Sequence, residues 1–204
     1  MNNSYFKYYQ PTFLLTLLVG LAIVLYLGFL HWGISVSIIT VISFLLLLID
    51  KFLWKYKPFS YLFWVKDFSG RYEGYLEYEF RDENCEIRRG RLKHVKIIHQ
   101  TASIIKISSF TFDTENHPSS ASESIEVAVA KGEHDVFTLI YTYRNDGNPK
   151  LGFAPHYGTE VIKVIEKNEK KCLSGDYYTN RTPIQTRGKF IDLEFTSNNL
   201  EHPF

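Results

Sequence analysis

The chain has 204 residues, a formal net charge of +1 at pH 7 and two cysteines. A charge this close to zero gives no reason to expect a nucleic-acid polymer as a partner. The cysteines, Cys85 and Cys172, are too few for a disulfide framework and too far apart for a paired metal motif, so we expect neither a metal nor a cofactor.

The first part of the chain is an apolar double span. Residues 12–30 form a run of nineteen residues without a charge. A second apolar run, residues 34–49, follows after a short break, and its predicted span extends to residue 54 at the membrane interface. About twenty helical residues cross a bilayer core, so residues 1–55 are predicted to form a transmembrane hairpin. A cleaved signal peptide is the competing interpretation. It is disfavoured because the first run is long, a second run follows at once, and no small-residue cleavage site is present.

Basic residues near the ends of the hairpin predict its orientation. They are Lys7 before the first run and Lys51, Lys55, Lys57 and Lys66 after the second. Because basic residues stay on the cytoplasmic side, both termini are expected in the cytoplasm. Residues 56–69 are rich in aromatic side chains and are predicted to form an interfacial connector. This connector is either a short amphipathic helix on the inner leaflet or a buried plug beneath the next domain.

Small residues recur along the first run. Thr16, Gly20 and Gly28 lie at spacings of four and eight, which places them on one helix face that a second backbone can approach closely. One interpretation is packing within the hairpin. The other is association of helices between protomers, which makes these three residues a candidate oligomerisation face.

From residue 70 the apolar pattern changes to period two, which is typical of strands with one buried face. Eight strands are predicted, at residues 70–80, 92–100, 102–111, 123–130, 135–144, 157–166, 171–181 and 187–195. Short links without a helix between them predict an eight-stranded up-and-down antiparallel β-barrel of lipocalin type over residues 70–204. A two-sheet sandwich would give the same pattern. Turns are expected at Arg89-Gly90 and at residues 118–120, where glycine, proline and serine gather.

In an up-and-down barrel, the ends of odd strands and the starts of even strands meet at one pole. Alternation predicts the following inward residues at the pole away from the membrane: Tyr78, Tyr143, Thr179, Arg181 and Arg187, with Lys189 in the same phase as Arg187. Rings stack on bases, guanidinium groups pair with phosphate oxygens, and a hydroxyl reads a base edge or a phosphate. The set is therefore typical of a nucleotide site. The competing interpretation is that the tyrosines fill the core and the arginines extend into water.

Nothing in the sequence indicates catalysis. A glycine-rich phosphate loop and a nucleophile motif are both missing, and the histidines have no spacing that suggests a shared metal. The basic run at residues 88–91 is predicted to be a solvated hairpin tip rather than a phosphate clamp. We therefore expect a binding protein and not an enzyme.

Three stretches carry a resemblance to a known family. They are the two adjacent N-terminal spans, GRYEGYLEY at residues 70–78, and LSGDYYTNRTPIQTRGKFIDLEF at residues 173–195. Together they resemble the SMODS-associated, two-transmembrane, β-strand-rich effectors of bacterial CBASS anti-phage defence. The resemblance covers the whole chain, and the segment Leu173–Arg181 with the strand that follows it is the most distinctive part.

The resemblance implies an eight-stranded barrel that binds a cyclic dinucleotide made by a cognate CD-NTase. Binding would drive the spans to form a homo-oligomer that disrupts the bacterial inner membrane and kills the infected cell. The family's binding roles carry over to Tyr78, Thr179 and Arg181, whereas Tyr143 and Arg187 rest on barrel geometry alone. The alternative function is a membrane-tethered, lipocalin-like binding protein for a lipid or another small apolar ligand.

Overall fold

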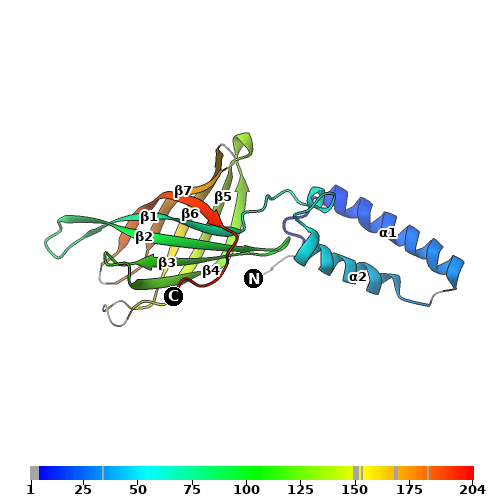
Figure 1. Ribbon diagram of the computed structural model, residues 1–204, viewed down its shortest axis with the longest axis horizontal. Helices are drawn as coiled ribbons and strands as arrows, with labels where there is room; N and C mark the ends of the chain where they lie inside the picture. The colour runs from blue at the N-terminus through cyan, green and yellow to red at the C-terminus, as the bar shows by residue number, and fades with distance from the viewer. Residues whose placement is uncertain (1–4, 34, 149–151, 153, 168–169, 183) are drawn as a thin grey trace. The chain divides into compact units, whose positions relative to one another are not determined.

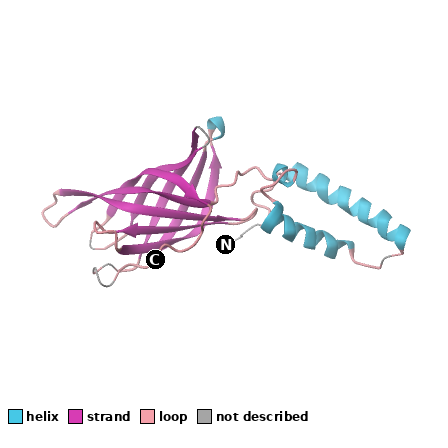
Figure 2. Cartoon of the chain, viewed as in Figure 1, coloured by secondary structure: helices cyan, strands magenta, loops and turns pink. Residues whose placement is uncertain are grey.

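The computed structural model describes residues 5–204 apart from residues 34, 149–151, 153, 168–169 and 183 (Figure 1). The chain divides into two units. The helical unit comprises Met1–Asp67 and Gln100–Ile104, and the barrel unit comprises Phe68–His99 and Ile105–Phe204. Figure 2 shows the long helices confined to the helical unit and the strands gathered in the barrel unit.

The first helix, α1 (Pro11–Trp32), contains 22 residues and no buried side chain. Pro11 occupies its first turn, where a missing backbone N–H is tolerated. The helix ends at Gly33, whose φ of 64° is the left-handed cap conformation that glycine adopts without strain. In the described part of the chain, α1 is the one helix long and apolar enough to cross a membrane.

The second predicted span is shorter in the structure than residues 34–54. Helix α2 (Ile38–Leu48) has eleven residues and continues into a five-residue π-helix, η1 (Ile49–Leu53). Eleven α-helical residues rise only about 16 Å, against a bilayer core of about 30 Å. Ser37, with φ −66° and ψ 120°, is still extended, so the apolar residues just before it are not helical. A second spanning helix is therefore not shown, and residue 34 lies outside the described residues.

The small-residue face of α1 is open within the helical unit. A Cβ atom built on Gly20 or on Gly28 would meet no heavy atom within 4 Å. The Thr16 hydroxyl donates to the Thr12 carbonyl oxygen of its own helix at 2.9 Å. Neither glycine is therefore needed for close packing of α1 against α2.

The predicted connector forms a short 3₁₀-helix, η2 (Phe59–Leu62), and not an amphipathic α-helix. Leu62, Phe63 and Val65 are buried. Phe63 also forms an isolated antiparallel bridge with Tyr9 of the N-terminal segment. The connector therefore packs within the helical unit.

The loop at residues 100–104 also belongs to the helical unit. The Ala102 backbone N–H donates to the Asp50 carbonyl oxygen of η1 at 3.1 Å. The Gln100 side-chain amide donates to the Lys66 carbonyl oxygen at 2.9 Å. This loop, which joins two barrel strands, is thus hydrogen-bonded to both the π-helix and the connector.

Eight antiparallel strands close into a barrel in sequence order, with β8 paired to β1. The strands are β1 (Gly70–Arg81), β2 (Ile87–Gln100), β3 (Ile105–Phe112), β4 (Pro118–Lys131), β5 (Phe137–Asn145), β6 (His156–Lys167), β7 (Lys170–Thr179) and β8 (Thr186–Ser197). A single turn of 3₁₀-helix, η3 (Glu133–Asp135), links β4 to β5. The predicted barrel is confirmed, and the sandwich is excluded because the sheet closes on itself.

Two predicted turns are wrong. Arg89 and Gly90 pair with β1 inside β2, so the basic run is part of a strand and the hairpin tip lies at residues 82–86. Pro118 starts β4 opposite Phe112. In both cases the residue type favours a turn, but pairing with the neighbouring strand decides the local conformation.

An apolar cluster lies on the outer face of β2 and β3. Val95, Ile97 and Phe110 form it and are each at most 2% exposed. The C-terminal segment covers them, since the rings of His202 and Phe204 lie 4.3 and 5.3 Å from that of Phe110. The inner faces of the same strands are therefore free to line the barrel interior.

Candidate ligand-binding pocket

The barrel contains a cavity of about 390 Å³ at the pole where odd strands end and even strands begin. This pole is called the pocket pole below. Its lining residues come from all eight strands and from the loop after β7: Leu76, Tyr78, Phe80, Leu92, His94, Thr111, Ser119, Ser120, Ser122, Tyr143, Asn145, His156, Glu160, Tyr177, Thr179, Arg181, Ile184, Thr186 and Phe190. The volume falls in the range typical of small-molecule sites.

Tyrosine rings form much of the wall. Tyr78 of β1 lies parallel to Phe80, with ring centroids 6.2 Å apart and an interplanar angle of 11°. Tyr143 of β5 and Tyr177 of β7 are 5% and 6% exposed. Burial raises the pKa of both buried phenols, so each keeps its proton and can donate a hydrogen bond inside the cavity.

Thr179 and Arg181 lie at the mouth of the pocket. The Thr179 hydroxyl accepts a hydrogen bond from the Thr186 backbone N–H at 3.0 Å and donates to the Thr186 carbonyl oxygen at 3.1 Å, which closes the β7–β8 hairpin. Arg181 follows the end of β7, not within the strand as predicted, and burial lowers its pKa. The two residues line the same cavity as Tyr78 and Tyr143.

The predicted inward orientation of Arg187 and Lys189 is wrong. In β8 three steps, from Phe190 to Leu193, match two steps on β7, from Gly175 to Leu173. This β-bulge inserts an extra residue and reverses the alternation on one side of it. Leu193 therefore points inward together with Phe190, whereas Arg187 and Lys189 point outward and are exposed.

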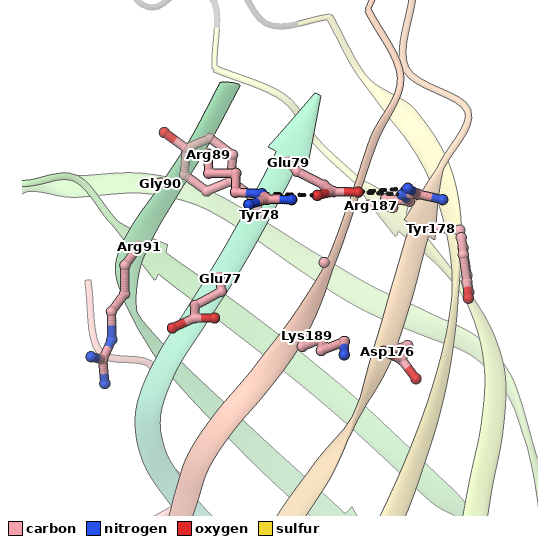
Figure 3. A pocket seen from close by; sticks show the side chains of 11 residues that line it. Glu77, Tyr78, Glu79, Arg89, Gly90, Arg91, Asp176, Tyr178, Arg187 and Lys189 are labelled. Carbon is pink, nitrogen blue, oxygen red and sulfur yellow. Dashed lines mark hydrogen bonds and ion pairs between the residues drawn. The ribbon is translucent and has the colours of Figure 1, made fainter. Parts of the chain in front are cut away.

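Arg187 lies in an outer groove of about 790 Å³ between β1, β2, β7 and β8 (Figure 3). There Glu79 lies between two guanidinium groups, bonded to Arg187 Nη2 at 2.6 Å and to Arg89 Nε at 3.2 Å. The hydrogen bond from Arg187, followed by that from Arg89, lowers the pKa of Glu79. The groove is larger than the inner pocket, but Arg89 and Arg187 are exposed to water and both already pair with Glu79. We therefore place the candidate site inside the barrel.

The floor of the barrel interior is polar. The Lys96 ammonium of β2 is fully buried and lies 2.7 Å from Glu160 Oε2 of β6 and 2.7 Å from Ser109 Oγ of β3. Tyr141 of β5 donates a short hydrogen bond to the same carboxylate oxygen. Burial lowers the pKa of Lys96, while the Glu160 carboxylate opposes this shift. The carboxylate also lines the pocket, so a polar floor lies beneath an aromatic wall.

Residues 63–192 match the family model of the Cap15 cyclic dinucleotide receptor domain. The chain belongs to this family of CBASS effectors. None of the curated proteins matches the chain. The matched residues contain seven of the eight strands in full and every residue that lines the inner pocket. Helices α1 and α2 lie outside them.

Sequence reasoning missed Glu160, which lines the inner pocket, and Lys96, which pairs with it. Glu160 is in phase with Ile162 and Val164 of its strand, and Lys96 is in phase with the buried His94 and Ile98. A charged residue in phase with buried ones was the available signal. The described residues hold no cluster of three or more metal-ligating side chains.

His94 is the one pocket residue whose buried polar atom has no hydrogen-bond partner in the described structure. Its Nδ1 lies 3.0 Å from Thr111 Oγ1, and its Nε2 is buried without a partner. Burial, and secondarily the charge of Lys96, lower its pKa well below 6.5, so the folded receptor holds a neutral imidazole.

Acid should therefore destabilise the receptor through His94. The unfolded chain takes up a proton at His94 below about pH 6.5 while the folded chain does not, so stability is complete above that pH and falls as the pH is lowered. One such proton contributes a slope of about 1.4 kcal/mol per pH unit. Urea unfolding at several pH values should show a shallower slope for His94→Gln than for wild type. The control is His99→Gln, at an exposed imidazole, and an unchanged slope in His94→Gln would contradict the assignment.

Proposed function

We propose that the chain is a membrane effector of anti-phage defence that is gated by a cyclic dinucleotide bound in the inner pocket. The observation that carries this proposal is the arrangement of the pocket in a chain of the Cap15 receptor family: aromatic walls, a cation at the mouth and a polar floor. The tyrosines offer faces for the bases, and Arg181 offers a planar fork for a phosphate.

The polar floor distinguishes this function from carriage of an apolar lipid. A buried ion pair such as Lys96–Glu160 requires hydrogen-bonded surroundings. An alkyl chain packed against Glu160 would displace water from the carboxylate without donating a hydrogen bond to it. Base edges carry donors and acceptors that can pair with the carboxylate, with Asn145 and with His156. Recognition is thus of a polar aromatic ligand.

The effector step is assigned to residues 1–55. In this proposal α1 and the shorter α2–η1 segment cross the inner membrane as a hairpin with both termini in the cytoplasm, as the basic residues beside the apolar runs support. The cognate CD-NTase supplies the ligand after infection. Because a ligand shifts an equilibrium only by its differential affinity, the nucleotide must bind the assembled state more tightly than the single protomer. Assembled hairpins then disrupt the bilayer.

The test uses the full chain in lipid vesicles loaded with a small dye. Cyclic di-AMP, cyclic di-GMP, cyclic GMP-AMP and cyclic di-UMP are titrated by calorimetry, and dye release is followed in parallel. We expect at least one of them to bind and to release dye, with linear dinucleotides of the same bases inactive. Binding without dye release would reject the effector step, and the absence of binding across the panel would reject the receptor assignment.

Gly20→Leu is expected to abolish ligand-induced assembly while leaving ligand affinity unchanged. Lipid gives helices no hydrophobic reason to associate, so close backbone packing must drive association. The open face at Gly20 would be filled by a leucine side chain. Chemical crosslinking measures assembly and dye release measures permeability.

The matched control for this variant is Val19→Leu, which adds bulk at an exposed position about 100° around α1. It should assemble as wild type does. If Gly20→Leu still assembles and still releases dye, the assembly surface lies elsewhere on the chain.

A further inference from the structure

Three tyrosines of the inner pocket each lie directly opposite a glycine on the neighbouring strand. Tyr78 of β1 pairs with Gly90 of β2, and Tyr143 of β5 pairs with Gly158 of β6. Tyr177 of β7 pairs with Gly188 of β8. All three tyrosines line the cavity.

The rings occupy the space that a side chain on the glycine would need. For a Cβ atom built on Gly90, the three nearest heavy atoms are Cζ, Oη and Cε1 of Tyr78. For one built on Gly158, the two nearest are Cζ and Oη of Tyr143. Figure 3 shows the Tyr78 ring overlying the β2 strand at Gly90. Each tyrosine therefore folds flat across its neighbouring strand instead of extending straight into the lumen.

The glycines differ in what else depends on them. A Cβ atom on Gly188 would overlap the Glu77 carbonyl oxygen, and one on Gly175 would overlap the Val161 carbonyl oxygen, so close strand approach alone requires glycine there. At Gly90 the nearest obstacle is only the Tyr78 side chain. Gly90 has no positive φ, so its strand conformation does not require glycine.

The first two pairs lie on opposite walls. Strands β1 and β5 are separated by three strands in each direction around a closed barrel of eight. Both pairs join a tyrosine near the end of an odd strand to a glycine on the next even strand, and both tyrosines line the cavity at the pocket pole. The interior thus presents two similarly built ring platforms facing the same cavity from opposite sides.

We propose that Gly90 and Gly158 are positioning residues of the ligand site, which hold the rings of Tyr78 and Tyr143 as two opposed platforms, one for each base of a cyclic dinucleotide. This inference rests on the proposed function. A cyclic dinucleotide carries two bases on one closed ring, so two fixed platforms match it and a ligand with a single base can use only one. Fixing the rings before binding removes the entropy of ordering them from the cost of association.

The test compares single and double variants of the full chain in detergent micelles. The probe is a cyclic dinucleotide in which 2-aminopurine replaces one base, since stacking on a ring quenches its fluorescence. We expect Gly90→Ala to weaken binding by about fivefold or more, equivalent to about 1 kcal/mol, because stacking of one base on a ring contributes about that amount or more. We also expect the bound probe to be brighter than with wild type.

The decisive comparison is made in a chain that lacks the ring. If Gly90 acts through Tyr78, adding Gly90→Ala to Tyr78→Ala should not weaken binding further, because the platform is already lost. Losses that add in the double variant would overturn the inference. Gly132→Ala, in the β4–β5 loop away from the pocket pole, is the matched control and should bind like wild type.

The same cycle with Gly158→Ala and Tyr143→Ala tests the second platform. A Cβ atom at Gly158 would also lie 2.6 Å from the Tyr178 carbonyl oxygen, so thermal unfolding must confirm that this variant folds. The Gly90 cycle does not depend on that outcome. If wild type binds no cyclic dinucleotide, the proposed function fails; if wild type binds and Gly90→Ala binds equally well, only this inference fails.

Discussion

Arg181→Ala is expected to lower the affinity for the cyclic dinucleotide by about thirtyfold or more. The guanidinium lies at the mouth of the inner pocket and is partly desolvated, and truncating one partner of a desolvated charge pair costs about 2–5 kcal/mol. Among the described lining residues of the pocket it is the one lysine or arginine, so no neighbouring cation there replaces it. Titration calorimetry of the full chain with a cyclic dinucleotide that binds wild type is the measurement.

Arg144→Ala is the matched control for Arg181→Ala. Arg144 lies near the end of β5 at the pocket pole, is exposed and pairs with Asp146 at 3.6 Å, but it does not line the inner pocket. It should bind the ligand as wild type does. Equal affinities for Arg181→Ala and wild type would remove Arg181 from the binding site.

Lys96→Met is expected to destabilise the receptor by about 3–5 kcal/mol, because it leaves the Glu160 carboxylate buried without its counter-charge. Both side chains are almost completely buried, at 0% and 4% exposure. Urea unfolding of the full chain in detergent measures the loss. Lys96→Met combined with Glu160→Gln should recover a large part of it, because the amide still accepts a hydrogen bond from Tyr141 and carries no charge.

The exposed ion pair Lys131–Asp135, with N···O 2.8 Å, provides the control for this prediction. Lys131→Met should cost no more than about 1 kcal/mol, since solvent screens exposed pairs. If Lys96→Met unfolds at the same urea concentration as wild type, the buried ion pair does not stabilise the barrel.

The barrel could be predicted because period-two alternation is a local property of each strand. The inward position of Tyr78 and Tyr143 followed from that alternation and from the order of the strands. The position of Arg187 did not, because the bulge between Phe190 and Leu193 depends on how β8 fits against β7 and carries no signal in the residue types.

Features that depend on pairing between distant residues could not be predicted from the sequence. Lys96 and Glu160 are 64 residues apart, and only the closed barrel brings them together. The glycine opposite each tyrosine is also a matter of register, which a one-residue shift would destroy. The length of the second helix was overestimated because apolar character was counted, whereas helix formation begins only at Ile38.

The backbone passes between the helical unit and the barrel unit three times, after Asp67, after His99 and after Ile104. The two units are therefore joined by three covalent connections. Two of them flank the loop at residues 100–104, whose strands carry Lys96 and Ser109 of the polar floor and whose Ala102 is bonded to the π-helix. The strands that carry these two floor residues are therefore continuous in the chain with a loop that is hydrogen-bonded to Asp50 of η1.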